Sequence, residues 1–369
     1  MRPRSYIIVL LLSVLCPLST CEEVVPLATA LRNALLPVLK NISRAYDDTA
    51  WSVAYKDANV TLEVCAGFAD NESKIPCNAS TDKYAFGSTT KSQTAVLVLN
   101  LVEQGRLNLD DLFVDRADTF VRRISNTSLP ELFPGPQLQK LTIRHLLQMQ
   151  SGIKDYDGRS VREFQNTHRG TDLGPIWVLE NADRTFYCEP GTCGIYSSTN
   201  YVMLGLVVAQ EMGLRNWDQL DQTAWTHGRS DFKETYYGVH GPCINFTDAQ
   251  KRRSGVVSGY QPVCHSPFHP YGTKDCVDFA NQSNIVHMSC TQGWTCGNLA
   301  TTVSQVAAFF WQLLSPASGH RILNATTLAH MLAFEKCSYF RHPKGKLNCA
   351  KTGDNSSRVW GYGLGLMNL

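Results

Sequence analysis

The chain has 369 residues, of which 43% are hydrophobic and 18% are charged. This is enough apolar material for a substantial core in one large or two closely packed domains, and it excludes an intrinsically disordered protein. Because 34 basic residues stand against 32 acidic ones, the net charge is only +2, and we expect no nucleic-acid partner and no anionic membrane surface.

Residues 1–21 have the pattern of a secretory signal peptide. Arg2 and Arg4 form a positive region, and a short apolar run follows over residues 6–15. That run is too short to cross a bilayer, and no later stretch reaches about 18 apolar residues, so no membrane span is expected. We therefore expect a secreted protein or one in the lumen of the secretory pathway. Residues 18–21 also resemble a bacterial lipobox, which leaves a lipid-anchored or cell-wall structural protein as an alternative.

The region after the signal predicts a helix, a hairpin and a buried helix. Residues 27–42 have an amphipathic period, and residues 51–55 and 60–67 alternate as two strands of a hairpin do. The apolar run 94–102 is closed by Gly105 and is hydrophobic nearly all round, which predicts a helix that is buried on every side.

The pattern of predicted elements changes near residue 106. Residues 106–294 predict short helices and polar loops. The helix predicted at 303–314 and the strand predicted at 361–367 again resemble the apolar helices and strands of the first hundred residues. We therefore predict an α/β (α+β) fold in which residues 24–105 and 295–369 form a discontinuous sheet domain. Residues 106–294 would form an inserted, mostly helical domain.

Sequons for N-glycosylation are unusually frequent. Composition alone would give roughly two or three, whereas nine Asn-x-Ser/Thr sequons occur, at Asn41, Asn59, Asn71, Asn78, Asn126, Asn245, Asn281, Asn324 and Asn355. This enrichment predicts a glycoprotein that follows a eukaryotic secretory route, with each modified asparagine on the surface.

Cysteine usage is also that of a secreted chain. Of 13 cysteines, Cys16 and Cys21 belong to or border the signal, and the other 11 are disulfide candidates with one left over. Cys188 and Cys193 flank Gly191 and are a hypothetical pair. No Cys-x-x-Cys pair with zinc spacing occurs, so we expect no metal and no cofactor.

The motif Ser-x-x-Lys places a hydroxyl and an amine on one helical face, as a serine nucleophile requires. It occurs three times, at Ser80, Ser88 and Ser151. Ser80 lies in a sequon and Ser151 follows the end of a predicted helix. Only Ser88, with Lys91, opens a buried helix whose free N–H groups can stabilise an oxyanion, so Ser88 is the predicted nucleophile.

The residues around Ser88 resemble a known family. The sequence Phe86-Gly87-Ser88-Thr89-Thr90-Lys91 and further stretches, in the same order over residues 50–367, are similar to the serine β-lactamase-related family, which includes class C β-lactamases, D-Ala-D-Ala carboxypeptidases and esterases. The other matching stretches are residues 101–111, 141–152, 196–205, 259–260, 297–299 and 361–365. The resemblance implies a β-lactamase/transpeptidase-like fold, an antiparallel sheet flanked by helices.

The resemblance also implies an acyl-enzyme mechanism. Ser88 would attack a carbonyl, Lys91 would help to take its proton, and Tyr196 would act as partner base and as proton donor to the leaving group. A free phenol titrates near pH 10, so Tyr196 would need the positive charge of Lys91 nearby. In the family the second motif is Tyr-x-Asn, whose amide holds the lysine. This chain has Ser198 there, a shorter hydroxyl that we expect to contact the substrate.

A second departure lies at the C-terminal end. In the family, a glycine-rich strand like residues 361–365 is followed by another that carries Lys-Thr-Gly or His-x-Gly and supplies the second oxyanion N–H. This chain ends at Leu369, so we expect its last strands to be missing. Lys351-Thr352-Gly353 precedes the glycine-rich strand and is interpreted as a decoy. An odd cysteine total also fits the loss of a downstream partner.

The sequence therefore predicts a secreted serine hydrolase that acts through an acyl-enzyme on a small ester or amide, as an esterase or a D-peptidase-like enzyme. Its expected partner is a small-molecule or peptide substrate, and its oligomeric state is open. Ser198 and the absent third motif motivate an alternative, a non-catalytic secreted relative or binding protein.

Overall fold

The computed structural model describes residues 21–45, 48–70, 73–168, 170–241, 289, 293–319, 322–336 and 361–368. Contacts divide the chain into two compact units. The first unit comprises the described residues within Met1–Phe86, Arg229–Met288 and Leu299–Arg321, and the second those within Gly87–Gly228, Ser289–Asn298 and Ile322–Leu369. The predicted division at residues 105 and 295 follows other boundaries and stays a prediction.

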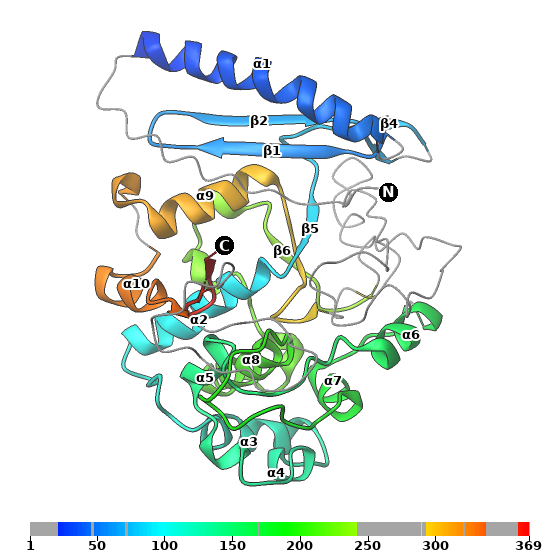
Figure 1. Ribbon diagram of the computed structural model, residues 1–369, viewed down its shortest axis with the longest axis vertical. Coiled ribbons are helices and arrows are strands. Elements are labelled where there is room, and N and C mark those ends of the chain that lie inside the picture. Colours follow the sequence, from blue (N-terminus) through cyan, green and yellow to red (C-terminus); the bar gives the residue numbers. More distant parts are fainter. Residues whose placement is uncertain are drawn as a thin grey trace. The chain divides into compact units, whose positions relative to one another are not determined.

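The first unit is built on a hairpin between two helices. Strands β1 (Trp51–Lys56) and β2 (Thr61–Ala66) pair in antiparallel fashion. Helix α1 (Cys21–Ala45) contacts β2, and α9 (Val303–Leu314) contacts β1, as Figure 1 shows. In β2 alternate residues are buried, and they pack against the apolar side of α1. The period-2 and helical patterns of the sequence meet in this core.

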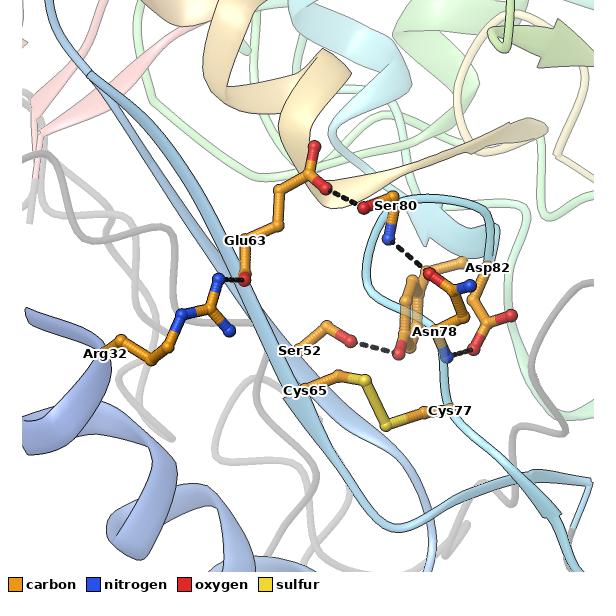
Figure 2. Close-up of a disulfide and its surroundings, with 9 residues drawn as sticks. Arg32, Ser52, Glu63, Cys65, Cys77, Asn78, Ser80 and Asp82 are labelled. Carbon is orange, nitrogen blue, oxygen red and sulfur yellow. Dashed lines mark hydrogen bonds between the residues drawn. A yellow bond between two sulfur atoms is a disulfide. The ribbon is translucent and has the colours of Figure 1, made fainter. Parts of the chain in front are cut away.

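Two small sheets complete the strands of the first unit. The first pairs β3 (Phe68–Asp70) with β4 (Ile75–Pro76). The second has the order β5–β7–β6, from Tyr84–Gly87, Leu299–Thr301 and Tyr236–Tyr237. A disulfide between Cys65 and Cys77 ties β2 to the segment after β4, beside the sequon asparagine Asn78 (Figure 2).

The second unit packs around α8 (Thr199–Glu211), which is buried from Thr199 through Ala209. The helices in contact with it are α2 (Thr90–Glu103), α3 (Phe113–Ile124), α5 (Ile143–Leu147) and α7 (Pro175–Asn181). The unit also holds α4 (Leu129–Leu132), α6 (Arg159–Thr167) and α10 (Ala325–Met331). Strands β8 (Glu335–Lys336), β9 (Gly361–Tyr362) and β10 (Met367–Asn368) form an antiparallel sheet in the order β10–β9–β8.

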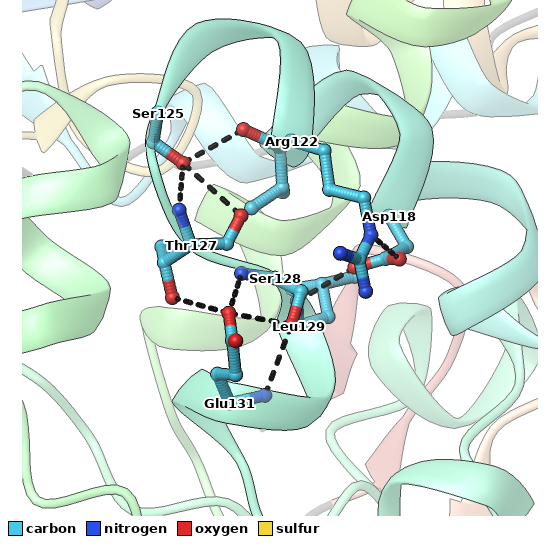
Figure 3. Close-up of polar contacts among 8 residues, drawn as sticks. Asp118, Arg122, Ser125, Thr127, Ser128, Leu129 and Glu131 are labelled. Atoms are coloured by element: carbon cyan, nitrogen blue, oxygen red, sulfur yellow. Dashed lines mark hydrogen bonds and ion pairs between the residues drawn. The ribbon is translucent and has the colours of Figure 1, made fainter.

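The short helix α4 shows how local polar groups define an element of this unit. Ser128 and Glu131 form a capping box, each side chain bonding the other residue's backbone N–H (Figure 3). Asp118 of α3 accepts from the backbone N–H of Leu129 at 2.7 Å and from Arg122 at 2.6 Å. A four-residue helix is too short to be stable by itself, so these caps and its contacts with α3 hold it.

The structure confirms three predicted helices and the predicted hairpin, but the single strand predicted at 361–367 is wrong: β9 and β10 are two short strands that pair in antiparallel fashion across a turn. The helix predicted at residues 27–42 lies within α1, the hairpin is β1–β2, and the run 94–102 lies within α2, most of which is buried. The helix predicted at 303–314 is α9. Within the described ranges, no helix is both long and apolar enough to cross a membrane.

Candidate active site

Ser88 lies on the surface in the turn that joins β5 to α2. Gly87 has φ +49°, in the left-handed region that favours glycine, and it redirects the chain at the end of the strand. The Thr90 hydroxyl donates to the Gly87 carbonyl at 2.6 Å, and the Lys91 backbone N–H donates to the Ser88 carbonyl at 3.1 Å. This helical turn exposes the Ser88 side chain while burying Lys91.

Lys91 is 2% exposed and its ammonium points at Ser88. The Nζ atom donates to Ser88 Oγ at 3.0 Å and to the Cys296 carbonyl at 2.9 Å. It also lies 5.0 Å from the centroid of the Tyr196 ring, within the range of a cation–π contact. Burial disfavours the charged form, but attraction to Tyr196, Cys296 and Asp155 outweighs it and raises the pKa of Lys91.

Tyr196 reaches the same serine from the segment that follows a disulfide-closed loop. Its hydroxyl lies 2.7 Å from Ser88 Oγ, to which it donates. The bond between Cys188 and Cys193, proposed from the sequence, is present just before it. The backbone N–H of Ile195 donates to the Met149 carbonyl at 2.9 Å, which fixes the loop on the segment after α5. Ser88, Lys91 and Tyr196 are therefore brought together as the sequence suggested, and their catalytic roles stay a proposal.

Residues 293–298 hold the two buried helices of the site. The Thr94 hydroxyl of α2 donates to the Thr295 carbonyl at 2.6 Å, and the Thr295 hydroxyl donates to the Tyr201 carbonyl of α8 at 2.8 Å. Thr295 has φ +36°, a strained conformation that these bonds maintain. The next residue supplies the carbonyl for Lys91. Residues 295 and 296 thus bond both α2 and α8 and position the Lys91 amine.

These three groups can support acyl transfer. An exposed hydroxyl with a phenol and a buried amine within hydrogen-bonding distance has a route for its proton during nucleophilic attack. Ser88 lies directly before α2, whose positive N-terminal end favours the negative charge that would develop there. Among the described residues, no three His, Cys, Asp or Glu side chains gather in a group that could hold a metal ion.

Comparison with known proteins identifies the fold that carries this site. Residues 45–368 match a family model described as Beta-lactamase. The chain belongs to the β-lactamase family. It is 27% identical to Protein flp of Staphylococcus aureus over 239 residues, which cover 63% of this chain and 43% of that protein. It is 25% identical to Penicillin-binding protein 4* of Bacillus subtilis over 183 residues, which cover 50% of this chain and 37% of that one.

The matched region is thus less than half the length of these curated relatives. Among solved structures, D-amino acid amidase from Ochrobactrum anthropi SV3, complexed with L-phenylalanine amide, aligns with a TM-score of 0.60 at 20% identity, covering 92% of this chain and 80% of that one. A D-stereospecific amidohydrolase from Streptomyces aligns with a TM-score of 0.57 at 19% identity, covering 93% and 82%. These alignments show the β-lactamase/transpeptidase-like fold of mixed helix and sheet.

The other two Ser-x-x-Lys matches are not arranged like Ser88 and Lys91. Ser80 bonds Glu63, as Figure 2 shows, while Lys83 pairs with Glu234 at 2.9 Å. Ser151 is fully buried and donates to Asn200 at 2.6 Å, whereas Lys154 pairs with Asp183. In both matches the serine and the lysine bond different partners.

The residues where the family pattern is broken have distinct positions. Ser198 is the N-cap residue of α8 and is 8% exposed, and its backbone N–H donates to the Asp155 carboxylate. Asn200 is fully buried, and its amide bonds Ser151 and Met149, whereas Lys91 bonds Ser88 and the Cys296 carbonyl. Lys351-Thr352-Gly353 lies outside the described residues.

The glycine-rich stretch near the C-terminus lies against α2. The Ser92 hydroxyl donates to the Gly365 carbonyl at 2.8 Å. Gly365 has φ +85°, and a Cβ added there would lie 2.3 Å from the Cβ of Ala95. Only glycine permits this approach, which explains why the stretch is glycine-rich where it meets the helix that carries Lys91.

Burial of Cys296 changes the interpretation of the cysteine count. Its thiol is free and fully buried, 3.3 Å from the Tyr156 hydroxyl. Apart from Cys296 and the four cysteines in the two disulfides, six remain of the 11 expected in the secreted chain, all outside the described residues, at Cys243, Cys264, Cys276, Cys290, Cys337 and Cys349. Six is an even number, so the odd total does not require a missing partner.

Two groups in the site were not singled out from the sequence. Asp155 and Cys296 act on Lys91 electrostatically, yet no periodic pattern marks either of them. Asp155 lies three residues beyond the stretch 141–152 that resembles the family, and a carboxylate so close to a family motif was the available signal. Cys296 contributes a backbone carbonyl, which any residue could supply, so the residue type at this position could not predict the contact with Lys91.

Proposed function

We propose that the chain is a secreted serine hydrolase that cleaves small esters or amides through an acyl-enzyme on Ser88. The observation that carries this proposal is the convergence of Tyr196 at 2.7 Å and Lys91 at 3.0 Å on one exposed hydroxyl. A structural serine would be buried with its own partners, as Ser151 is. Membership of the β-lactamase family supports the same assignment.

The proposed reaction has two halves. Ser88 Oγ attacks the substrate carbonyl and its proton passes to the Tyr196 and Lys91 pair, while backbone N–H groups at the start of α2 stabilise the oxyanion. Collapse breaks the bond to the alcohol or amine, which leaves with a proton from Tyr196. Water then attacks the ester on Ser88, gives its proton to the same pair and releases the acid, which restores the hydroxyl.

The first test is covalent labelling. Purified protein is incubated with a fluorophosphonate, and its intact mass is measured over time. We expect one adduct per chain on Ser88 in the wild type and none in Ser88→Ala. Circular dichroism of both proteins checks that they are folded. A folded wild type that never gains the adduct would contradict the proposal and favour the non-catalytic alternative, which Ser198 motivates.

The substrate panel follows from the names of the structural neighbours. An amidase complexed with L-phenylalanine amide and a D-stereospecific amidohydrolase share the fold, so D- and L-phenylalanine amides are the first amides to assay. Small p-nitrophenyl esters and a chromogenic β-lactam complete the panel. We expect turnover of an amide or ester that is lost in Ser88→Ala, and we expect the ester or amide to exceed the β-lactam.

Secretion and glycosylation form a separate part of the proposal. The expected signal peptide lies outside the described residues. Five sequon asparagines are described, and all five are exposed: Asn41, Asn59, Asn78, Asn126 and Asn324. Expression in eukaryotic cells, followed by glycosidase treatment and sequencing of the mature N-terminus, tests this part. A mature N-terminus at Cys21 carrying a lipid would instead support the anchored alternative.

A further inference from the structure

The backbone on both sides of Tyr196 is bonded to one residue, Met149. The Ile195 N–H donates to the Met149 carbonyl at 2.9 Å, and the Ser197 N–H donates to the Met149 thioether sulfur at 3.4 Å. Met149 and Ser197 are both fully buried. These two bonds fix the chain directly before and directly after the tyrosine, so the place of the phenol depends on the torsions of its own side chain.

Met149 has a backbone conformation that methionine rarely adopts. Its φ is +58°, in the left-handed region, which a residue other than glycine enters at a cost and keeps only where its surroundings hold it there. Its own N–H donates to the Leu146 carbonyl of α5 at 3.3 Å, while its carbonyl and its sulfur both accept from the segment that carries Tyr196. The strained turn thus presents two acceptors of one residue to that segment.

A buried network fixes the Met149 sulfur as well. The Ser151 hydroxyl donates to the side-chain oxygen of Asn200 at 2.6 Å, and the Asn200 amide nitrogen donates to the Met149 sulfur at 3.2 Å. The sulfur therefore accepts N–H groups from two residues at the start of α8. A thioether is a weak acceptor, but solvent cannot take its place here, because Ser151, Ser197 and Asn200 are all fully buried.

We propose that Met149 is a positioning residue for Tyr196. This inference rests on the proposed function. By holding both neighbours of the tyrosine, Met149 keeps the phenol 2.7 Å from Ser88 Oγ, a separation at which a proton can pass between them. An apolar side chain of similar size would fill the same space but would release the backbone after Tyr196. A displacement of about 1 Å is enough to slow a reaction by about 100-fold.

The first test removes the sulfur and keeps the volume. Leucine is as disfavoured as methionine in the left-handed region, so Met149→Leu removes the acceptor without adding backbone strain. We expect the fluorophosphonate to label Ser88 about 10–30-fold more slowly in this variant. Met203→Leu is the matched control, because Met203 is also fully buried and lies in α8, and its rate should stay within about twofold of the wild type. A Met149→Leu rate within that same limit overturns the inference.

A double-mutant cycle separates positioning from a general loss of structure. Adding Met149→Leu to Tyr196→Phe removes the acceptor from a protein that no longer has the phenol hydroxyl. If Met149 acts through that hydroxyl, its further effect on the labelling rate should be less than about threefold. A larger further loss would show that Met149 supports the fold of the site rather than the phenol, and it would overturn the inference. Circular dichroism checks that each variant is folded.

A second measurement depends neither on catalysis nor on the folding of a variant. In protein made with 15N-labelled serine, hydrogen exchange of the Ser197 N–H is followed by NMR and assigned with Ser197→Ala. We expect exchange at least about 100-fold slower than in an unstructured chain. It should be about tenfold faster in Met149→Leu than in the wild type and unchanged in Met203→Leu.

This exchange keeps the two proposals distinguishable. If the folded wild type never labels on Ser88, the proposed function fails, and the exchange of the Ser197 N–H still decides whether Met149 holds the segment of Tyr196. A wild-type N–H that exchanges as fast as in an unstructured chain, or one whose exchange Met149→Leu leaves unchanged, overturns the inference.

Discussion

Two segments of the second unit carry the same four-residue pattern and have different outcomes. Between Ser88 and Lys91 the chain is a helical turn, so the amine lies 3.0 Å from the hydroxyl. Between Ser151 and Lys154 the chain passes Gly152 with φ +74°, which prevents a helix. Ser151 is consequently buried against Asn200, and Lys154 turns outward to Asp183. The pattern indicates chemistry only where the backbone is helical.

The largest effect expected from this comparison is at the two lysines. Lys91→Met keeps most of the side-chain volume but removes the buried ammonium, and we expect the labelling rate on Ser88 to fall by about 10³-fold, within the range for a lost proton-transfer group. Intact-mass kinetics measure this. Lys154→Met removes only a partly exposed ion pair and should leave the rate unchanged. A Lys91→Met rate within tenfold of the wild type would show that the pair is not catalytic.

A somewhat smaller effect is expected at the phenol. Tyr196→Phe removes the hydroxyl that lies 2.7 Å from Ser88 Oγ, and we expect labelling to slow by about 10²-fold with little change in stability. Tyr187→Phe is the control, because that tyrosine directly precedes Cys188 and is 51% exposed. Equal rates for the two variants would remove Tyr196 from the mechanism.

The two serines should separate function from stability. Ser151→Ala leaves the buried Asn200 oxygen and the Ile153 N–H without the hydroxyl, so unfolding in urea should cost about 1–3 kcal/mol less than in the wild type. Ser88→Ala changes an exposed side chain and should shift the free energy of unfolding by less than about 0.5 kcal/mol. Labelling should be lost only in Ser88→Ala. The reverse pattern would exchange their roles.

The smallest effect is the pH dependence of stability near Asp155. Its pKa is raised from the usual range to about 6, so the unfolded state loses this proton at lower pH than the folded state does. Stability from this group therefore falls as the pH rises from about 4 to about 6. In scanning calorimetry, the melting temperature of Asp155→Asn should gain a few degrees on the wild type over that interval. A constant difference would contradict the raised pKa.

The sequence predicted what depends on local spacing. The hairpin, α1, α2 and α9 each follow from a period-2 or helical pattern, and Ser88 with Lys91 follows from residues one turn apart. Tyr196 came only from the resemblance to a family, since 108 residues separate it from Ser88. The Cys296 carbonyl lies 205 residues from Lys91. Contacts at such separations depend on packing, which no local pattern encodes.

Lys91 combines a proposed catalytic role with almost complete burial, and this burial limits which reagents can reach it. Reagents that acylate amines need a free lone pair that they can approach from solvent, whereas the Lys91 amine is 2% exposed and lies beside the rings of Tyr196 and Tyr201. Surface footprinting of the folded protein would therefore mark lysines such as Lys154 and leave Lys91 unmodified. Modification of Lys91 by such a reagent would report unfolding of the second unit.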